Sequence, residues 1–215
     1  VILPANTFIA TALAVTRCGA TPVFVDNDEF YLINPLEVEK KITKKTKAII
    51  AVNLYGQLAN LKELNKISKQ NSLYLIEDSA QSHGAFNDSF SKNYSVASAY
   101  SFYPGKNLGA WGDGGAVTTN NKKLYKIALK LSNHGKNQKK QFWSDLIGFK
   151  FKMSNLQAAL GYAQIKRINK ILKKKIEIFN LYKKYLVTKN IFINPQKKGE
   201  INSYWMPTIV LKKSL

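Results

Sequence analysis

Leu73-Tyr-Leu-Ile-Glu-Asp-Ser-Ala-Gln81 is an apolar, strand-like run that ends in an acid and an amide. Further short apolar runs occur along the chain at residues 23–25, 48–52, 96–100 and 116–118. Segments compatible with helices lie before or between them, at residues 7–17, 35–42 and 61–70. Because the runs are apolar throughout rather than alternating, we expect strands that are covered on both faces. The sequence therefore predicts an α/β domain built on a largely parallel sheet.

The pattern changes after Asn133, where a polar stretch is followed by one long helical pattern over residues 153–185, with Ser154 as its expected N-cap. We expect residues 1–150 to form the large domain. Residues 151–215 are expected to hold a linking helix and the beginning of a smaller C-terminal domain. The chain opens on the strand-like Val1-Ile-Leu-Pro4 without a start signal. We therefore expect an internal piece of a longer protein that lacks the N-terminal part of its large domain.

The composition excludes several classes of protein. The 215 residues are 45% hydrophobic, which is enough for a sizeable core, and no apolar run is long enough to cross a bilayer. The single cysteine, Cys18, rules out a disulfide framework, so we expect a cytoplasmic protein with no membrane partner. No His or Cys residues have metal-ligand spacing, and no metal site is expected.

The formal net charge of +20 raises the question of nucleic-acid binding. Arg17 and Arg167 are the two arginines among 33 basic residues, whereas nucleic-acid sites favour the bidentate arginine side chain. The lysines are spread along helical segments, so a solvated surface is the favoured interpretation. A basic nucleic-acid-binding or regulatory protein that only keeps the fold is the alternative from a different class.

The loop Ser101-Phe-Tyr-Pro-Gly-Lys106 follows a strand-like run and precedes a glycine-rich stretch that ends at Gly115. A partly desolvated lysine on a loop can act as an imine-forming nucleophile. Asp78 also follows a strand, and ligands of such sheets bind beyond the carboxyl ends of the strands. Asp78 alone could cap a helix, bind a metal or hold a protonated ring nitrogen. Together with Gln81 and Lys106, it indicates a pyridoxal-phosphate pocket.

These segments resemble the sugar aminotransferases of the DegT/DnrJ/EryC1/StrS family, which are fold-type-I pyridoxal-phosphate enzymes. The matching motifs occur in family order over nearly the whole chain: 4–11, 19–26, 46–50, 54–57, 77–84, 101–115, 133–135 and 153–159. The resemblance implies the fold-type-I large domain, with a mixed, mostly parallel sheet, and pyridoxal 5'-phosphate as the cofactor.

The resemblance also implies a role for individual residues. Lys106 would hold the cofactor covalently and move a proton to and from the substrate carbon. Asp78 would pair with the pyridine nitrogen, Gln81 with the cofactor's 3-oxygen, and Ser101 with its phosphate. Phe8 would stack on the ring, although packing as a core residue explains it equally well.

Three further positions are implied less directly. Asn133 and His134 match a motif that approaches the nucleotide-sugar, although a surface turn explains them equally well. Lys150 stands where the family has an Asn that reaches the phosphate of the neighbouring subunit, and a lysine could bind phosphate there as a point charge. The family's upstream phosphate-cradling segment, a Gly-Thr-Ala-like helix start, is absent from this sequence.

The activity that the resemblance implies is transfer of an amino group from L-glutamate to a nucleotide-linked keto-deoxysugar. Such a homodimeric enzyme would serve polysaccharide, O-antigen or glycoside biosynthesis, and the motifs leave open whether carbon 3 or carbon 4 is aminated. A sugar dehydratase of the same fold is an alternative. Dehydratases of this kind carry His in place of the lysine, so Lys106 argues against a dehydratase.

Overall fold

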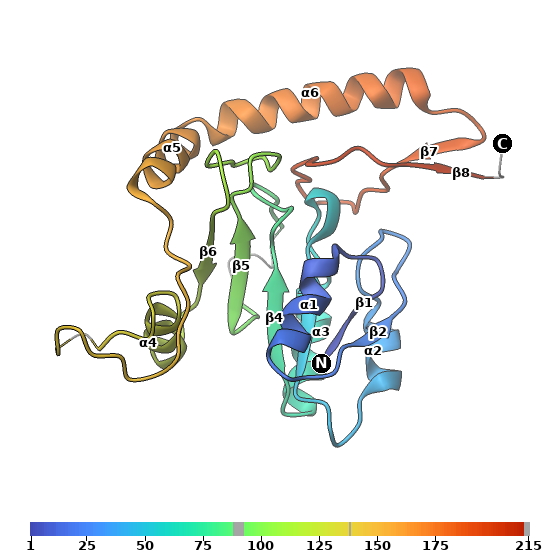
Figure 1. Ribbon diagram of the computed structural model, residues 1–215. Helices are drawn as coiled ribbons and strands as arrows, with labels where there is room; N and C mark the ends of the chain where they lie inside the picture. Colours follow the sequence, from blue (N-terminus) through green and yellow to red (C-terminus); the bar gives the residue numbers. More distant parts are fainter. Residues whose placement is uncertain (88–92, 138, 213–215) are drawn as a thin grey trace.

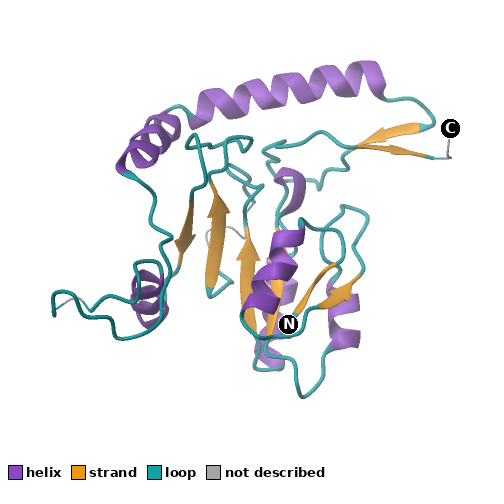
Figure 2. Ribbon diagram, viewed as in Figure 1, coloured by secondary structure: helices purple, strands orange, loops and turns teal. Residues whose placement is uncertain are grey.

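A computed structural model describes residues 1–87, 93–137 and 139–212. In this part of the chain, the larger of two sheets has the strand order β2-β1-β3-β4-β5-β6. Its strands are β1 (Ile2–Pro4), β2 (Val23–Val25), β3 (Ala48–Val52), β4 (Tyr74–Asp78), β5 (Ala97–Ser101) and β6 (Gly115–Thr118). The first five are parallel, and β6 pairs antiparallel with β5. The predicted α/β class with a mixed, mostly parallel sheet is confirmed (Figure 2).

The strand register brings the ends of three neighbouring strands level with one another. Val52 pairs with Asp78, and Asp78 pairs with Ala99. The chain then leaves β5 at Ser101, passes through the loop that carries Lys106, and returns at Gly115, which pairs with Ser101. A loop that returns beside the strand it left produces an antiparallel pair, which is why β6 differs from the other strands.

Helices cover both faces of this sheet. In Figure 1, α1 (Ile9–Arg17) lies in front of it, and α2 (Pro35–Lys41) and α3 (Leu61–Gln70) lie behind it. The main core cluster joins the rear helices to the strands: Ile2, Val25, Ile33, Val38, Ile49, Ala51, Ala59, Leu61, Leu64, Ile67 and Leu75. The apolar character of the early strands follows from this two-sided cover.

Local capping explains where the rear helices begin. The Asn34 side chain accepts from the backbone N–H of Leu36, with Pro35 in the first turn, and the Asn60 side chain accepts from that of Glu63. The helix expected over residues 7–17 is confirmed and ends at Arg17, but Thr7 is not its N-cap, because Phe8 occupies that position and α1 begins at Ile9. The Thr7 hydroxyl instead lies 2.8 Å from the Thr11 hydroxyl.

The C-terminal third departs further from expectation. Ser154 caps α5 (Asn155–Lys166) through a reciprocal capping box with Gln157, as expected. The expected single helix is in fact two, because Arg167 takes a non-helical conformation between α5 and α6 (Ile168–Leu186). Helix α4 (Lys122–Leu131), which follows β6, was not anticipated.

A small antiparallel hairpin of β7 (Ile191–Ile193) and β8 (Ile209–Leu211) follows α6. Residues 213–215 of the expected C-terminal domain lie outside the described residues. Across the described ranges, none of the helices has both the length and the hydropathy that crossing a bilayer requires.

Candidate active site

Asp78 ends β4 and is held there from two sides. Its Oδ2 accepts a 2.7 Å hydrogen bond from the hydroxyl of Thr11 on α1, and its Oδ1 accepts a 3.1 Å bond from the backbone N–H of Ala80. The carboxylate is therefore oriented both by a distant helix and by its own turn. Sequence reasoning missed Thr11, because no local pattern relates a helix residue to an acid 67 positions away.

Glu77, the neighbouring acid, has a separate set of partners. It is buried, and its Oε1 accepts from the hydroxyls of Ser95 and Ser98, at 2.5 and 3.0 Å. Its Oε2 accepts a 2.9 Å bond from the amide of Asn53. Successive strand residues point to opposite faces, so these two carboxylates do not act as a pair. Glu77 belongs to a buried polar network that ties β4 to its neighbours.

Gln81 lies three residues beyond Asp78 and is buried. Its Oε1 accepts a 2.9 Å bond from the backbone N–H of Tyr55. Tyr55 lies in the 3-10 turn η1 (Leu54–Gly56) and has a positive φ of 55°. The side-chain oxygen of Gln81 is therefore already occupied by a backbone donor. The amide NH2 group is the part of Gln81 that is suited to donate to another group.

The loop between β5 and β6 is held in a defined shape around Lys106. The Lys106 N–H donates to the carbonyl of Tyr103 at 2.9 Å, and the Ala110 N–H to that of Phe102 at 2.8 Å. Gly109 packs so closely that an added Cβ would lie 2.9 Å from the Pro104 carbonyl oxygen. The lysine is therefore presented from an ordered turn.

The Lys106 amine is half-buried, and its surroundings act on it in opposite directions. Burial lowers the pKa of Lys106, and the negative charge of Asp78 offsets part of that pKa shift. The structure thus brings Asp78 and Lys106 close enough to interact electrostatically, as the sequence predicted from their positions after neighbouring strands. A lysine with a lowered pKa has a larger share of the nucleophilic free amine at neutral pH.

Trp205 also contacts this lysine. Its ring centroid lies 3.9 Å from the Lys106 Nζ, and its indole N–H donates to the Gly105 carbonyl at 2.9 Å. No local pattern in the sequence predicts this contact, because Trp205 lies 100 positions beyond Gly105.

Two more predicted site residues lie near the ends of their elements. Ser101 is the last residue of β5, and its Oγ accepts a 3.3 Å bond from the Tyr103 N–H. Its hydroxyl proton remains able to donate. Phe8 occupies the N-cap position of α1 and is 68% exposed, so the alternative of packing as a core residue is wrong.

His83 is a buried group that the sequence did not place in the site. Its ring lies 5.8 Å from that of Tyr100 and 5.9 Å from that of Phe102. Burial lowers its pKa to about 4; the charge of Lys106 adds to the lowering, and the Ser101 backbone offsets a little of it. Neither ring nitrogen makes a hydrogen bond of standard geometry within the described ranges. His83 is therefore a neutral, buried ring behind the lysine loop.

The remaining predicted residues lie elsewhere in this chain. Asn133 and Lys150 form an isolated antiparallel bridge, and the His134 N–H donates to the Phe149 carbonyl at 2.8 Å. The segment that carries them follows α4 at the lower end of the sheet in Figure 1, whereas the lysine loop lies at the upper end. Within one copy of the chain, the structure does not bring these three residues to Lys106.

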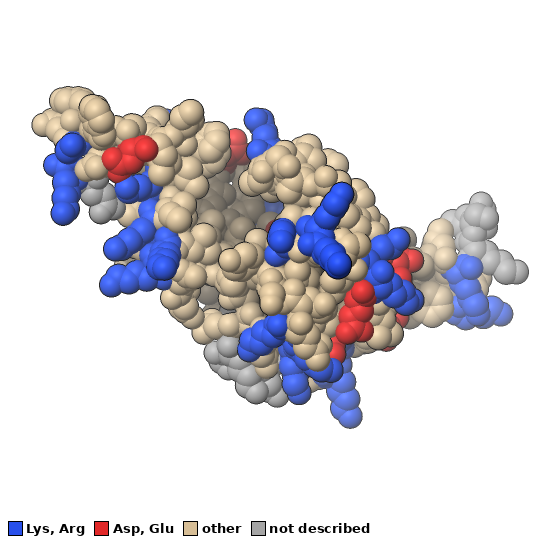
Figure 3. Space-filling view, turned by 90° about the horizontal axis from the view of Figure 1, so that it is seen from below, with Lys and Arg blue, Asp and Glu red and all other residues tan. Residues whose placement is uncertain are grey.

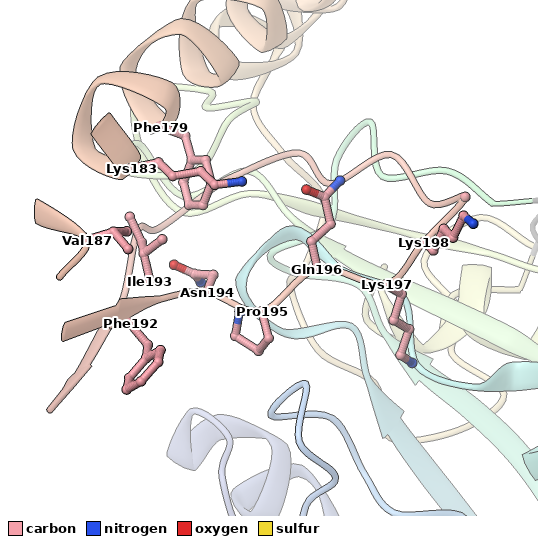
Figure 4. A pocket seen from close by; sticks show the side chains of 11 residues that line it. Phe179, Lys183, Val187, Phe192, Ile193, Asn194, Pro195, Gln196, Lys197 and Lys198 are labelled. Atoms are coloured by element: carbon pink, nitrogen blue, oxygen red, sulfur yellow. The ribbon is translucent and has the colours of Figure 1, made fainter. Parts of the chain in front are cut away.

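A concave region of about 490 Å³ lies between the end of α6 and the segment after β7 (Figure 4). Lys183, Lys197 and Lys198 contribute to its lining, but none of the predicted site residues does. Lys197 also forms an ion pair with Asp28, at 3.9 Å. Among the residues that the structure describes, no group of three His, Cys, Asp or Glu side chains could hold a metal ion.

Lysine and arginine side chains are scattered over the face seen from below (Figure 3). They are spread across this face and around its edge, and Asp and Glu side chains are interspersed with some of them. The positive charge does not gather into one patch on this face, as expected of a solvated lysine-rich surface.

Three features bear on the class of protein: the strand order, the acid at the end of β4 and the lysine on the loop after β5. The model of the DegT/DnrJ/EryC1/StrS aminotransferase family matches residues 1–214, and this chain belongs to that family.

Named relatives support this assignment. The chain is 35% identical to GDP-perosamine synthase from Vibrio cholerae over 213 residues, covering 98% of this chain and 58% of that protein. It is 41% identical to dTDP-3-amino-3,4,6-trideoxy-alpha-D-glucose transaminase from Streptomyces venezuelae over 162 residues, covering 74% and 42%. The solved structure of NtdA from Bacillus subtilis with bound cofactor PMP has a TM-score of 0.88 at 30% identity, covering 98% and 48%. The chain thus spans about half the length of these relatives.

Proposed function

We propose that the complete protein is a pyridoxal-phosphate-dependent aminotransferase that acts on a nucleotide-linked keto-deoxysugar, with L-glutamate as the amino donor. The observation that carries the proposal is the placement of Asp78 at the end of β4, paired with Ala99 of the strand from which the loop with Lys106 leaves the sheet. The charge of Asp78 acts on the Lys106 amine in this arrangement. The names of the two curated relatives support a nucleotide-sugar substrate. NtdA, with its bound PMP, supports the cofactor, since PMP is the amine form of pyridoxal phosphate.

The residues at this edge fit the cofactor. Asp78 would hold the pyridine nitrogen, because its carboxylate is fixed by Thr11 and by the turn at Ala80. Gln81 would donate from its amide NH2 group to the ring oxygen, because its own oxygen is already taken by Tyr55. Ser101 would donate its hydroxyl proton to phosphate, and Phe8 would cover one face of the ring with its exposed side chain.

When bound, pyridoxal phosphate acts as an electron sink for the carbon that carries the amine. Lys106 would hold the cofactor covalently in the resting enzyme and would afterwards act as the base and acid at the substrate carbon. Burial supports both tasks, because the lowered pKa of Lys106 increases the share of free amine near neutral pH. The neutral His83 behind the loop adds no second positive charge next to that amine.

Other residues would be supplied across a subunit interface. Lys150, Asn133 and His134 lie far from Lys106 in one copy of the chain, and Lys150 is exposed. In a homodimer, Lys150 would reach the phosphate of the neighbouring subunit, and Asn133 and His134 would approach the nucleotide-sugar. We further propose that residues 1–150 belong to the cofactor-binding domain and that residues 151–215 begin the smaller domain of a cytoplasmic enzyme.

The test is amino transfer by the complete protein. With pyridoxal phosphate, L-glutamate and a panel of GDP-, dTDP- and UDP-linked keto-sugars, we expect an amino-sugar to form together with one equivalent of 2-oxoglutarate. Nuclear magnetic resonance of the product would show whether carbon 3 or carbon 4 carries the nitrogen. A dehydrated sugar with no 2-oxoglutarate would favour the dehydratase. Steeply salt-dependent DNA binding without cofactor uptake would favour the nucleic-acid alternative.

A further inference from the structure

Trp205 contacts the lysine loop in two independent ways, although it lies 100 positions beyond Gly105. Its indole N–H donates to the Gly105 carbonyl at 2.9 Å, immediately before Lys106. Its ring face lies against the Lys106 ammonium, with 3.9 Å between the Nζ and the ring centroid. One contact fixes the backbone of the loop, and the other fixes the end of the lysine side chain.

The segment before Trp205 is firmly attached to the rest of the molecule. The Ser203 N–H donates to the Gly56 carbonyl, and the Asn107 amide donates to the Ser203 carbonyl, both at 2.9 Å. Ser203 and Asn107 are 1% and 3% exposed, so these bonds are protected from water. Tyr204 stacks on Phe179 of α6, with ring centroids 3.9 Å apart. Trp205 is therefore held in place by its neighbours rather than lying loosely on the loop.

The attraction between an ammonium and an indole depends on the charge of the amine. A cation over the face of a tryptophan gains about 0.5–1 kcal/mol at exposed sites and about 2 kcal/mol or more where both groups are desolvated. An amine that is neutral loses most of this attraction, and an amine that is covalently bonded to a bound molecule is held at that molecule instead. The Lys106 amine is therefore attracted to the Trp205 ring only while it is free and protonated.

We propose that Trp205 is a positioning residue for Lys106, which provides the resting place of the free ammonium and holds the lysine loop through Gly105. This role rests on the proposed function, since it concerns the periods when Lys106 is not bound to the cofactor. Through Ser203, Tyr204 and Phe179, it also links the reactive lysine to α6.

The test measures Lys106 itself in the cofactor-free complete protein. The rate at which an acylating reagent labels Lys106 is followed by peptide mass spectrometry from pH 6 to 10. Removing the ring with Trp205→Leu, which keeps an apolar cover, should lower the pKa of Lys106 by about one and speed its labelling near neutral pH about fivefold to tenfold. Trp205→Phe keeps a ring face without the N–H and should stay within about twofold of the wild type.

Trp143→Phe is the matched control, because Trp143 is 57% exposed and lies beside Lys140 in another part of the chain. It should leave the labelling of Lys106 unchanged. Thermal unfolding of each variant separates a folding defect from a local effect, and Trp205→Phe keeps the test valid if Trp205→Leu does not fold. Equal Lys106 labelling in the wild type, Trp205→Phe and Trp205→Leu would overturn the role of Trp205 even where amino transfer is observed. Absence of amino transfer in the wild type would overturn the proposed function, whatever the labelling shows.

Discussion

The hydroxyl of Thr11 lies 2.7 Å from Oδ2 of Asp78 and donates a hydrogen bond to it, joining the first helix to the end of β4. Thr11 is 4% exposed, so this bond is shielded from water. The bond fixes the direction in which the carboxylate faces. Thr11 thereby becomes a candidate for tuning the cofactor site from a position that no motif identifies.

Replacing Thr11 with Val keeps the shape of the side chain and removes the donor. A hydrogen bond to a charged group contributes about 1.5–3 kcal/mol, so we expect pyridoxal phosphate to bind at least roughly tenfold more weakly. Thr11→Ser should retain most of the affinity. Thr16→Val is the control, because the Thr16 hydroxyl bonds within its own helix to Leu13. Cofactor titration followed by absorbance measures the difference, and equal affinity in Thr11→Val and the wild type would exclude this role.

Gly56 lies where the turn η1 meets the segment that leads to Trp205. Its φ is +92°, and an added Cβ would lie 2.6 Å from the Tyr204 backbone N and 2.6 Å from Asn202 Oδ1. Gly56→Ala should therefore reduce the free energy of unfolding by about 2 kcal/mol or more, because strain and overpacking add. Gly19→Ala also has a positive φ, of +70°, but meets open space, and should cost only about 1 kcal/mol. Denaturant unfolding of both variants tests the difference, and equal losses would show that the packing at Gly56 is not tight.

His83 makes the stability of the fold depend on pH. Its pKa of about 4 in the folded state lies below the usual 6.5, so the unfolded chain binds more protons between these values. The folded state therefore loses stability as the pH falls through this window, by about 2 kcal/mol at pH 5 from this group alone. Above pH 7 this loss of folding stability is absent.

The check compares the wild type with His83→Phe, which cannot titrate. The difference in unfolding free energy between the two should shift in favour of the variant by about 2 kcal/mol on going from pH 7.5 to pH 5. A difference that stays constant over this range would show that His83 remains accessible to protons in the folded state. The matched control is His134→Phe, since His134 is exposed.

The alternation of apolar runs and helical segments was enough to predict the sheet. Each run in β2, β3 and β4 is short and rich in β-branched or aliphatic residues, and side-chain caps such as Asn34 mark where a helix starts. The break at Arg167 carries no such signal, because neither Gly nor Pro occurs there. Helix α4, by contrast, could have been predicted: the Asn121 side chain caps it by accepting from the backbone N–H groups of Lys123 and Leu124, and apolar residues recur along it at helical spacing.

Part of the candidate site could likewise be predicted from the sequence, and part of it could not. Asp78 and Lys106 could be related from the sequence, because both follow neighbouring strands and such residues meet at one edge of a parallel sheet. The contacts of Thr11 and Trp205 depend on where a helix and a distant segment fold back, and local sequence does not encode that placement. The distance of Lys150 from Lys106 likewise follows from the chain's path after α4.

Lys106 is the residue proposed to hold the cofactor, and the roles proposed for its neighbours depend on it. In the complete protein, Lys106→Ala should fold as the wild type does, since the side chain is only half-buried and contributes little to the core. Lys136→Ala, at another loop position, serves as the control for general loss of a lysine.

The most direct measurement is reduction of the cofactor-loaded protein with borohydride, followed by peptide mass spectrometry. We predict one stable pyridoxyl adduct, on Lys106, in the wild type and in Lys136→Ala, and none in Lys106→Ala. An adduct on a different lysine, or an undiminished adduct in Lys106→Ala, would contradict the account.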